Sequence, residues 1–181
     1  MWCGLRMKKS VLLALTILLL CSNCYAEVLE KPSTFSYVFD YADVISTSDE
    51  YLISLYAMTA YNAQAAQVVV VTVNSLSGMN ASDYATEMIN SWGIGRADVN
   101  DGILILLAPN ERVIQLGTGS GIEMQITGER CGQLIDDYAI ELLASNRFSE
   151  GLVRLTKAVC LEAVLRRTPL FDEPDLIRDL L

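Results

Sequence analysis

The residues of this chain that could do chemistry are carboxylates, amides and hydroxyls, because the sequence contains no histidine. That absence excludes Ser-His-Asp and Cys-His nucleophilic catalysis, histidine-ligated zinc and the commonest general base. Oxygen atoms remain, and they are the ligands that hard divalent cations such as calcium and magnesium prefer. Acidic residues in loops are therefore the first candidates for a site.

Four residues are candidate metal ligands: Asp43, Asn100, Asp101 and Glu123. Asp43 ends a short extended piece, whereas Asn100 and Asp101 directly precede an apolar run, and Glu123 closes a glycine-rich turn. If the fold brings these loops together, the crowded carboxylates would repel one another and a divalent cation would relieve the repulsion. The alternative is that residues 98–102 form only an Asx turn, whose side chains bond their own backbone.

Two further features could bind anions, but they lack the usual signatures. The segment Gly117-Thr118-Gly119-Ser120-Gly121 has Ile122 where a dinucleotide fingerprint has its third glycine, and it lacks the lysine of a Walker loop. We therefore interpret it as a chain reversal that needs positive φ angles and close backbone approach. Arg96 and Arg112 could neutralise a phosphate, although a surface role is the simpler interpretation.

Two apolar runs, residues 68–73 and 103–108, predict the strands that position these loops. Unbroken Val, Ile and Leu runs are typical of strands buried on both faces, which requires helices on both sides of the sheet. Residues 112–116 follow a Pro-Asn turn and predict an antiparallel hairpin with the second run. Polar residues are thus confined to the strand ends, where open α/β sheets usually place their ligand sites.

The helices are predicted from their caps and stops. A capping box at Thr47 and Glu50 begins the first, Gly93 ends the second, Thr127 caps the third, and Ser149 begins the last. We expect helices over residues 47–65, 82–92, 127–145 and 149–167. Helices alternating with strands in this way predict an α/β fold, a three-layer α/β/α sandwich around a small mixed sheet.

The N-terminus has the pattern of a secretory signal peptide. A basic start at residues 7–9 precedes an apolar core at residues 11–20, and the small residues Cys24 and Ala26 stand at the −3 and −1 positions before a cleavage after Ala26. The apolar core is too short to span a bilayer of about 30 Å comfortably. A lipoprotein signal is disfavoured because Leu20 and Asn23 stand where a small residue is expected. These features predict cleavage near Ala26 and a periplasmic or secreted protein.

Cleavage would leave 155 residues, enough for one domain with a proper core. We expect a leader or linker at residues 27–36, the domain at 37–167 and a C-terminal tail at 168–181, with no membrane span after cleavage. The chain carries a charge of −9, and the signal peptide takes away three basic residues and no acid, which leaves −12. Such an acidic surface excludes nucleic acid as a partner and is compatible with binding cations. An acidic surface that is simply solvated is the commoner interpretation of such a charge.

Two cysteines, Cys131 and Cys160, lie in the part expected after cleavage. In an oxidising compartment they could form one disulfide. Each also lies on a predicted helix among apolar neighbours, so two buried thiols are an equal alternative.

Five segments, in this order and spacing, resemble the TPM-domain family of bacterial envelopes, thylakoid lumens and a receptor-associated animal branch. They are residues 43–46, the strand at 66–73, Trp92-Gly93-Ile94-Gly95, Asn100-Asp101-Gly102-Ile103-Leu104 and Gly119-Ser120-Gly121-Ile122-Glu123. The resemblance covers roughly residues 41–165. It implies the same α/β/α arrangement.

The resemblance also implies calcium in an acidic pocket and, from the plant branch, phosphatase activity. Asp43, Asn100, Asp101 and Glu123 stand at matching motif positions. One position departs from the family, which commonly has an aspartate where this chain has Gly128. If that carboxylate serves the metal or the chemistry, this chain has lost it.

Three hypotheses about function remain, and none assigns a catalytic residue. The first is a secreted envelope accessory domain that binds a divalent cation, calcium or magnesium, and an envelope or membrane protein. The second is a metal-assisted acid phosphatase, in which a carboxylate-held cation would polarise a phosphoryl oxygen and activate water. The third is a purely structural or protein-interaction domain whose acids form only turns and caps.

Overall fold

The structure is a computed structural model and describes residues 28–167. The predicted signal peptide at 1–26 and the predicted tail at 168–181 lie outside the described residues. Within the described part, no helix is both long enough and apolar enough to cross a membrane.

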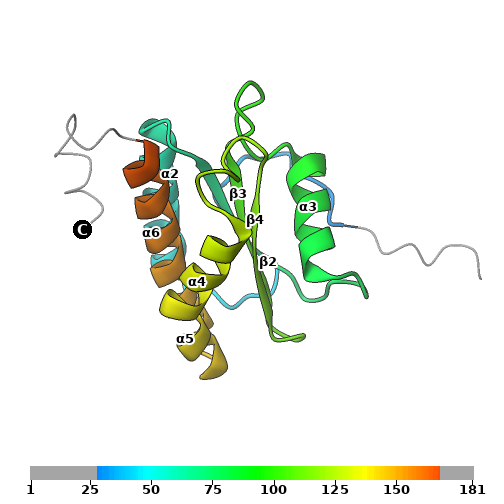
Figure 1. Cartoon of the computed structure of the whole chain (residues 1–181). Helices are drawn as coiled ribbons and strands as arrows, with labels where there is room; N and C mark the ends of the chain where they lie inside the picture. The colour runs from blue at the N-terminus through cyan, green and yellow to red at the C-terminus, as the bar shows by residue number, and fades with distance from the viewer. Residues whose placement is uncertain (1–27, 168–181) are drawn as a thin grey trace, which may run out of the picture.

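A four-stranded mixed sheet forms the centre of the fold (Figure 1). Its strands, in spatial order, are β1 (Val38–Asp40), β2 (Gln67–Thr72), β3 (Gly102–Ala108) and β4 (Val113–Thr118). The first three strands are parallel, and β4 returns antiparallel to β3 with Leu116 opposite Ile105. The predicted hairpin and mixed sheet are therefore confirmed.

Helices cover both faces of this sheet, as Figure 1 shows. One face holds α3 (Ala81–Trp92), and the other holds α2 (Thr47–Asn62), α4 (Gly128–Tyr138), α5 (Ile140–Ala144) and α6 (Phe148–Arg167). The predicted three-layer α/β/α sandwich is confirmed. The helix predicted over 127–145 is divided in two, because the backbone leaves helical geometry at the buried Ala139, where φ is −122°.

Alternate residues of the central strands supply two separate cores. Val68 and Val70 of β2 pack with the α2 and α6 layer, whereas Val69 and Val71 pack with α3. Every residue of β3 is buried. The strands are thus buried on both faces, as the unbroken apolar runs predict.

The helix caps largely follow the sequence signals. Gly93 ends α3 in the left-handed conformation with a φ of 61°, and Thr127 caps α4 by accepting the backbone N–H of Arg130. The predicted first cap is one residue too late, since Ser46 and not Thr47 is the N-cap of α2. Its hydroxyl accepts from the N–H of Asp49 at 3.3 Å.

The segment at residues 28–36 has neither helix nor strand, and its first two residues pack against α3. Val28 is buried in the α3 core. The indole N–H of Trp92 donates to the Leu29 carbonyl at 2.6 Å, and the Leu29 N–H donates to the Tyr84 hydroxyl at 3.4 Å.

An ion pair joins α4 to α6 beside the two cysteines. Arg130 donates to both carboxylate oxygens of Glu162, with Nε–Oε1 at 2.9 Å and Nη2–Oε2 at 3.0 Å. This hydrogen bonding lowers the pKa of the Glu162 carboxyl below its ordinary value. Cys131 and Cys160 are both buried as free thiols, and burial raises the pKa of each. Cys131 and Cys160 therefore form no disulfide in this structure, and the alternative of two buried thiols is the one observed.

Replacing Glu162 with glutamine is expected to lower the free energy of unfolding at neutral pH by about 1–2 kcal/mol, because Arg130 then loses its charged acceptor. A carboxyl whose pKa is lowered by folding stabilises above its unfolded pKa, near 4.5, and loses that contribution as the pH falls through the folded value. The difference between wild type and Glu162→Gln, measured by urea unfolding, should therefore shrink below pH 4.5. Glu87→Gln, at an exposed acid of α3, is the matched control and should show no such trend.

Candidate functional site

The four candidate ligands lie at two opposite edges of the sheet. Asp43 follows the carboxyl end of β1, whereas Asp101 precedes the first residue of β3. Since β1, β2 and β3 are parallel, the length of β2 separates the two acids, roughly 17 Å. Asn100, Asp101 and Glu123 share one edge because β4 returns antiparallel beside β3. The expectation that all four converge is wrong for Asp43, and cation binding by the other three stays a prediction.

Within residues 28–167, no three acidic or cysteine side chains come close enough to hold a metal ion by themselves. Any cation at this edge would therefore need amide, hydroxyl or backbone oxygens besides a carboxylate. Asn100 and the backbone of the glycine turn supply such groups.

At the Asp43 edge, Asp40 is the acid that organises the loop. Its carboxylate accepts from the N–H of Ile45 at 2.7 Å and from the hydroxyl of Thr72. Asp43 itself is exposed and adopts a left-handed φ of 53°. Aspartate tolerates this conformation in turns, so Asp43 has the properties of a turn residue.

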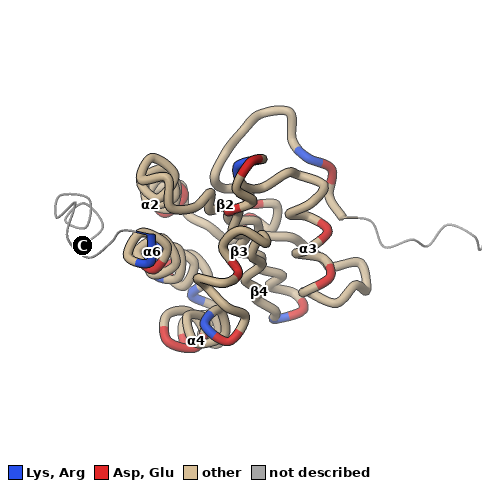
Figure 2. Tube along the Cα trace, turned by 45° about the horizontal axis from the view of Figure 1, so that its top comes forward, with Lys and Arg blue, Asp and Glu red and all other residues tan. Residues whose placement is uncertain are grey.

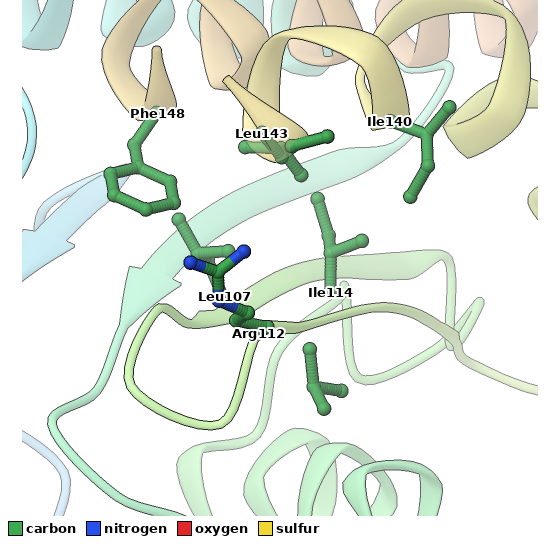
Figure 3. Close-up of a pocket in the computed structure, with 8 residues that line it drawn as sticks. Leu107, Arg112, Ile114, Ile140, Leu143 and Phe148 are labelled. Atoms are coloured by element: carbon green, nitrogen blue, oxygen red, sulfur yellow. The ribbon is translucent and has the colours of Figure 1, made fainter. Parts of the chain in front are cut away.

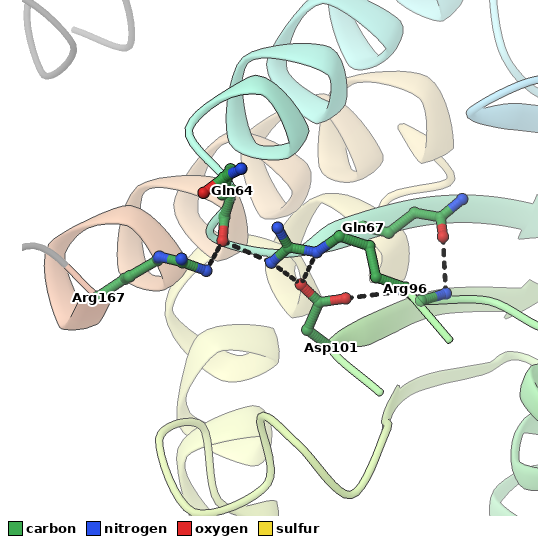
Figure 4. Close-up of polar contacts among 6 residues, drawn as sticks. Gln64, Gln67, Arg96, Asp101 and Arg167 are labelled. Atoms are coloured by element: carbon green, nitrogen blue, oxygen red, sulfur yellow. Dashed lines mark hydrogen bonds and ion pairs between the residues drawn. The ribbon is translucent and has the colours of Figure 1, made fainter. Parts of the chain in front are cut away.

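Asp101 is only 3% exposed, and Arg96 neutralises it (Figure 4). Its Oδ1 accepts from the backbone N–H of Arg96 at 2.9 Å, and its Oδ2 accepts from Nε at 2.7 Å and also from Nη2. A buried charge needs such a partner, because an unpaired one would cost several kcal/mol. Asp101 therefore has a structural role that the isolated sequence did not indicate, although Arg96, five residues earlier in the same loop, was the available signal.

The Arg96 side chain also reaches the end of α2, and neighbouring contacts join the same loop to α6 and β2. Its Nη2 donates to the Gln64 carbonyl at 2.6 Å, just after α2, and Arg167 at the end of α6 donates to the same carbonyl. The amide oxygen of Gln67 accepts from the N–H of Gly95 at 2.7 Å (Figure 4). These contacts fix the loop between α3 and β3 at both its beginning and its end.

The glycine turn packs directly on this loop. A Cβ at Gly119 would lie 2.3 Å from the Asn100 carbonyl oxygen, and one at Gly121 would lie 1.7 Å from the Val99 oxygen. The N–H of Gly121 donates to the Asn100 carbonyl at 3.0 Å. The predicted close backbone approach is confirmed. The predicted positive φ is wrong, because neither glycine has one and Asn100 adopts the left-handed φ of 54°.

A pocket of about 550 Å³ opens between α3, the fixed loop and the glycine turn. Its polar lining includes Asn90, Asn100, Thr118, Ser120 and Glu123, but neither Arg96 nor Asp101. The Glu123 carboxylate forms no ion pair with any described residue. The pocket thus offers one free carboxylate together with amide and hydroxyl oxygens, a donor set that suits a hard cation.

Neither of the two arginines considered as phosphate partners lines this pocket. Arg96 is occupied by Asp101, and Arg112 precedes β4 at the opposite end from Glu123. Gly128, where an aspartate is common in the family, begins α4 and has open space around its Cβ position. An aspartate would fit there, so the missing carboxylate is a feature of this chain and not a consequence of crowding.

Substituting Gly121 with alanine should cost about 1–3 kcal/mol of unfolding free energy, because the added Cβ would overlap the Val99 carbonyl oxygen. Gly132→Ala is the matched control, since nothing lies within 4 Å of its Cβ position inside α4. Alanine is the better helix former there and should stabilise by about 0.5–1 kcal/mol. Chemical denaturation measures both, and equal effects would contradict the contact between loop and turn.

Solved structures of other proteins share this fold. The N-terminal domain of a protein from P. gingivalis superposes with a TM-score of 0.67 and is 24% identical, covering 77% of this chain and 92% of its own. The N-terminal domain of protein cg2496 from Corynebacterium glutamicum has a TM-score of 0.58 at 19% identity, covering 82% and 92%. At these identities the likeness shows the fold alone.

None of the curated proteins compared with the chain matches it. The sequence profile of the TPM domain, in contrast, matches residues 38–160. This match runs from β1 into α6 and contains every strand of the sheet and the loops of the pocket. The chain therefore belongs to the TPM domain family.

Proposed function

We propose that this TPM domain is a secreted accessory domain of the cell envelope that binds a divalent cation, calcium foremost, and a partner protein. The observation that carries the cation part is the unpaired carboxylate of Glu123 in a pocket with the oxygens of Asn100 and Ser120. Calcium accepts six to eight such oxygens in flexible geometry. With one carboxylate in the site, we expect a dissociation constant of about 10⁻⁴–10⁻³ M, as in extracellular modules.

The surroundings of the pocket favour a cation over an anion. The helix α3, which borders the pocket through Thr86 and Asn90, carries Asp83 and Glu87 and no basic residue. Figure 2 shows these acidic positions along α3, whereas α4 and α6 carry both signs of charge. The nearest arginine of the loop is already paired with Asp101. The local potential should therefore be negative and attract a cation.

Catalysis has less support than binding. The carboxylate of Asp101 and the guanidinium of Arg96 satisfy each other, and the family's aspartate is replaced by Gly128. Glu123 would then be the single free carboxylate available to hold a metal and activate water in the pocket described. A binding role asks only that its oxygen coordinate the ion.

Removing the Glu123 charge is the direct test of the cation site. Isothermal titration calorimetry with calcium should show binding to wild type, and Glu123→Gln should weaken it at least tenfold, because a neutral amide attracts the ion less. Asp43→Asn is the matched control, since Asp43 is an equally exposed acid at the opposite edge of the sheet.

Absence of calcium binding to wild type at several millimolar would remove the cation from the proposed function and leave a protein-interaction domain. An equal loss in Asp43→Asn and Glu123→Gln would show that the charge of the whole chain, and not this pocket, attracts the ion.

A further inference from the structure

We propose that the free edge of β4 binds an extended peptide of a partner protein, one with an apolar residue and an acidic residue two positions apart. An unpaired strand edge, an apolar pocket and an arginine without a partner meet at this place. The inference rests on the partner-binding part of the proposed function and does not depend on the cation.

The first observation is the direction of the β4 backbone groups. β4 is the last strand of the sheet, and no described strand lies on its outer side. The N–H of Gly119 donates to the Gly102 carbonyl at 2.8 Å, so Gly102 and Gly119 form a hydrogen-bonded pair. Hydrogen-bonded and non-hydrogen-bonded pairs alternate from there along the hairpin, and Ile114 and Leu116 belong to non-hydrogen-bonded pairs. Ile114 and Leu116 therefore direct their N–H and C=O groups away from β3. The Leu116 carbonyl indeed accepts from the side chain of Gln115 at 2.9 Å.

An added strand would satisfy these outward groups. Exposed edges of this kind recruit extended peptides, whose main chain supplies affinity and whose alternate side chains supply specificity. Ile114 is partly exposed, whereas Leu116 is buried and its carbonyl is covered by the Gln115 amide. A peptide N–H would have to displace this amide. The edge thus offers the main-chain half of a peptide site.

The second observation is an apolar pocket at the start of the same strand (Figure 3). It has a volume of about 190 Å³ and lies between β4 and the helices α5 and α6. Its walls include Leu107, Ile114, Ile140, Leu143, Ala144 and Phe148. Pockets for drug-sized ligands measure about 300–1,000 Å³. This one suits a single aliphatic or aromatic side chain.

The third observation is the guanidinium of Arg112, which lies over this pocket in Figure 3. It has no ion pair or hydrogen bond with any described residue. The Arg112 backbone is held in the turn, with its N–H donating to the Pro109 carbonyl at 3.2 Å and a φ of 55°. A carboxylate is the natural partner for such a group.

The spacing of the peptide residues follows from strand geometry. Side chains two positions apart project from the same face of a strand. An apolar side chain in the pocket and a carboxylate on Arg112 must both lie on the α5 face of the sheet. The partner segment therefore has the form apolar, any residue, acidic, in either chain direction.

A second copy of this chain fits the site less well than a foreign peptide does. Its own edge strand, Val113–Thr118, contains no acidic residue and could not pair with Arg112. Two copies joined along β4 would place no acidic strand residue against either guanidinium.

The sequence after Arg167 is the other competitor. Its first pair of this form, Leu170 with Asp172, reaches roughly 18 Å at most beyond Arg167. The helix α6 runs from Phe148 at the pocket to Arg167 and is about 30 Å long. Only the later pairs, each of which contains Ile177 or Asp179, could span that length.

The probe is a fluorescent polythreonine peptide with blocked termini. It contains one leucine and, two positions later, one glutamate. Titration with the whole protein, followed by fluorescence anisotropy, should show saturable binding that EDTA does not change. Arg112→Gln and Ala144→Phe should each weaken binding at least fivefold, by removing the charge partner and by filling the pocket. Arg154→Gln, an exposed arginine of α6 outside the pocket, is the control and should bind as wild type.

A second probe tests strand addition itself. Methylating the peptide nitrogens that face β4 should abolish binding, whereas methylating the alternate nitrogens should leave it unchanged. The proposal is overturned if wild type does not bind, if Arg112→Gln binds equally well, or if both methylated peptides behave alike. Tighter peptide binding by Ile177→Ser with Asp179→Asn would assign the pocket to the chain's own tail and also overturn it. Calcium binding without peptide binding would refute this inference and leave the cation site standing.

Discussion

The buried ion pair between Arg96 and Asp101 holds together the edge of the sheet where the candidate pocket lies. A carboxylate at the entrance of a dry strand is costly unless donors surround it, and Arg96 supplies both its backbone N–H and its guanidinium. The same guanidinium reaches the Gln64 carbonyl and so fastens the loop to the helical layer. The glycine turn then packs on this fixed loop, and the pocket forms between them.

This arrangement changes the meaning of the acidic loop. Asp101 stands among the sequence-predicted ligands, yet its oxygens are occupied by groups of the protein itself. The neighbouring Asn100 and the distant Glu123 face the solvent-open pocket instead. The structural role thus belongs to Asp101 and the proposed ligand-binding role to the adjacent Asn100. Asp101 fixes the backbone of the loop and thereby positions Asn100 at the pocket.

The layers of the fold were predictable because their signals are local. Unbroken apolar runs at residues 68–73 and 103–108 need cover on both sides, and the Pro-Asn turn joins the second run to its antiparallel neighbour. The position of Asp43 was not predictable in this way. It depends on β1 being parallel to β2 and β3, which places its carboxyl end at the far edge. Strand direction and order come from long-range pairing, to which no short motif corresponds.

The most direct test of the Arg96–Asp101 constraint is a double-mutant cycle in urea unfolding. Arg96→Gln and Asp101→Asn should each cost about 3–5 kcal/mol, because each leaves one member of the pair without its partner. The double variant should lose little more than either single one, which would give a coupling of a few kcal/mol. Additive losses, or an Asp101→Asn variant as stable as wild type, would contradict the central role of this ion pair.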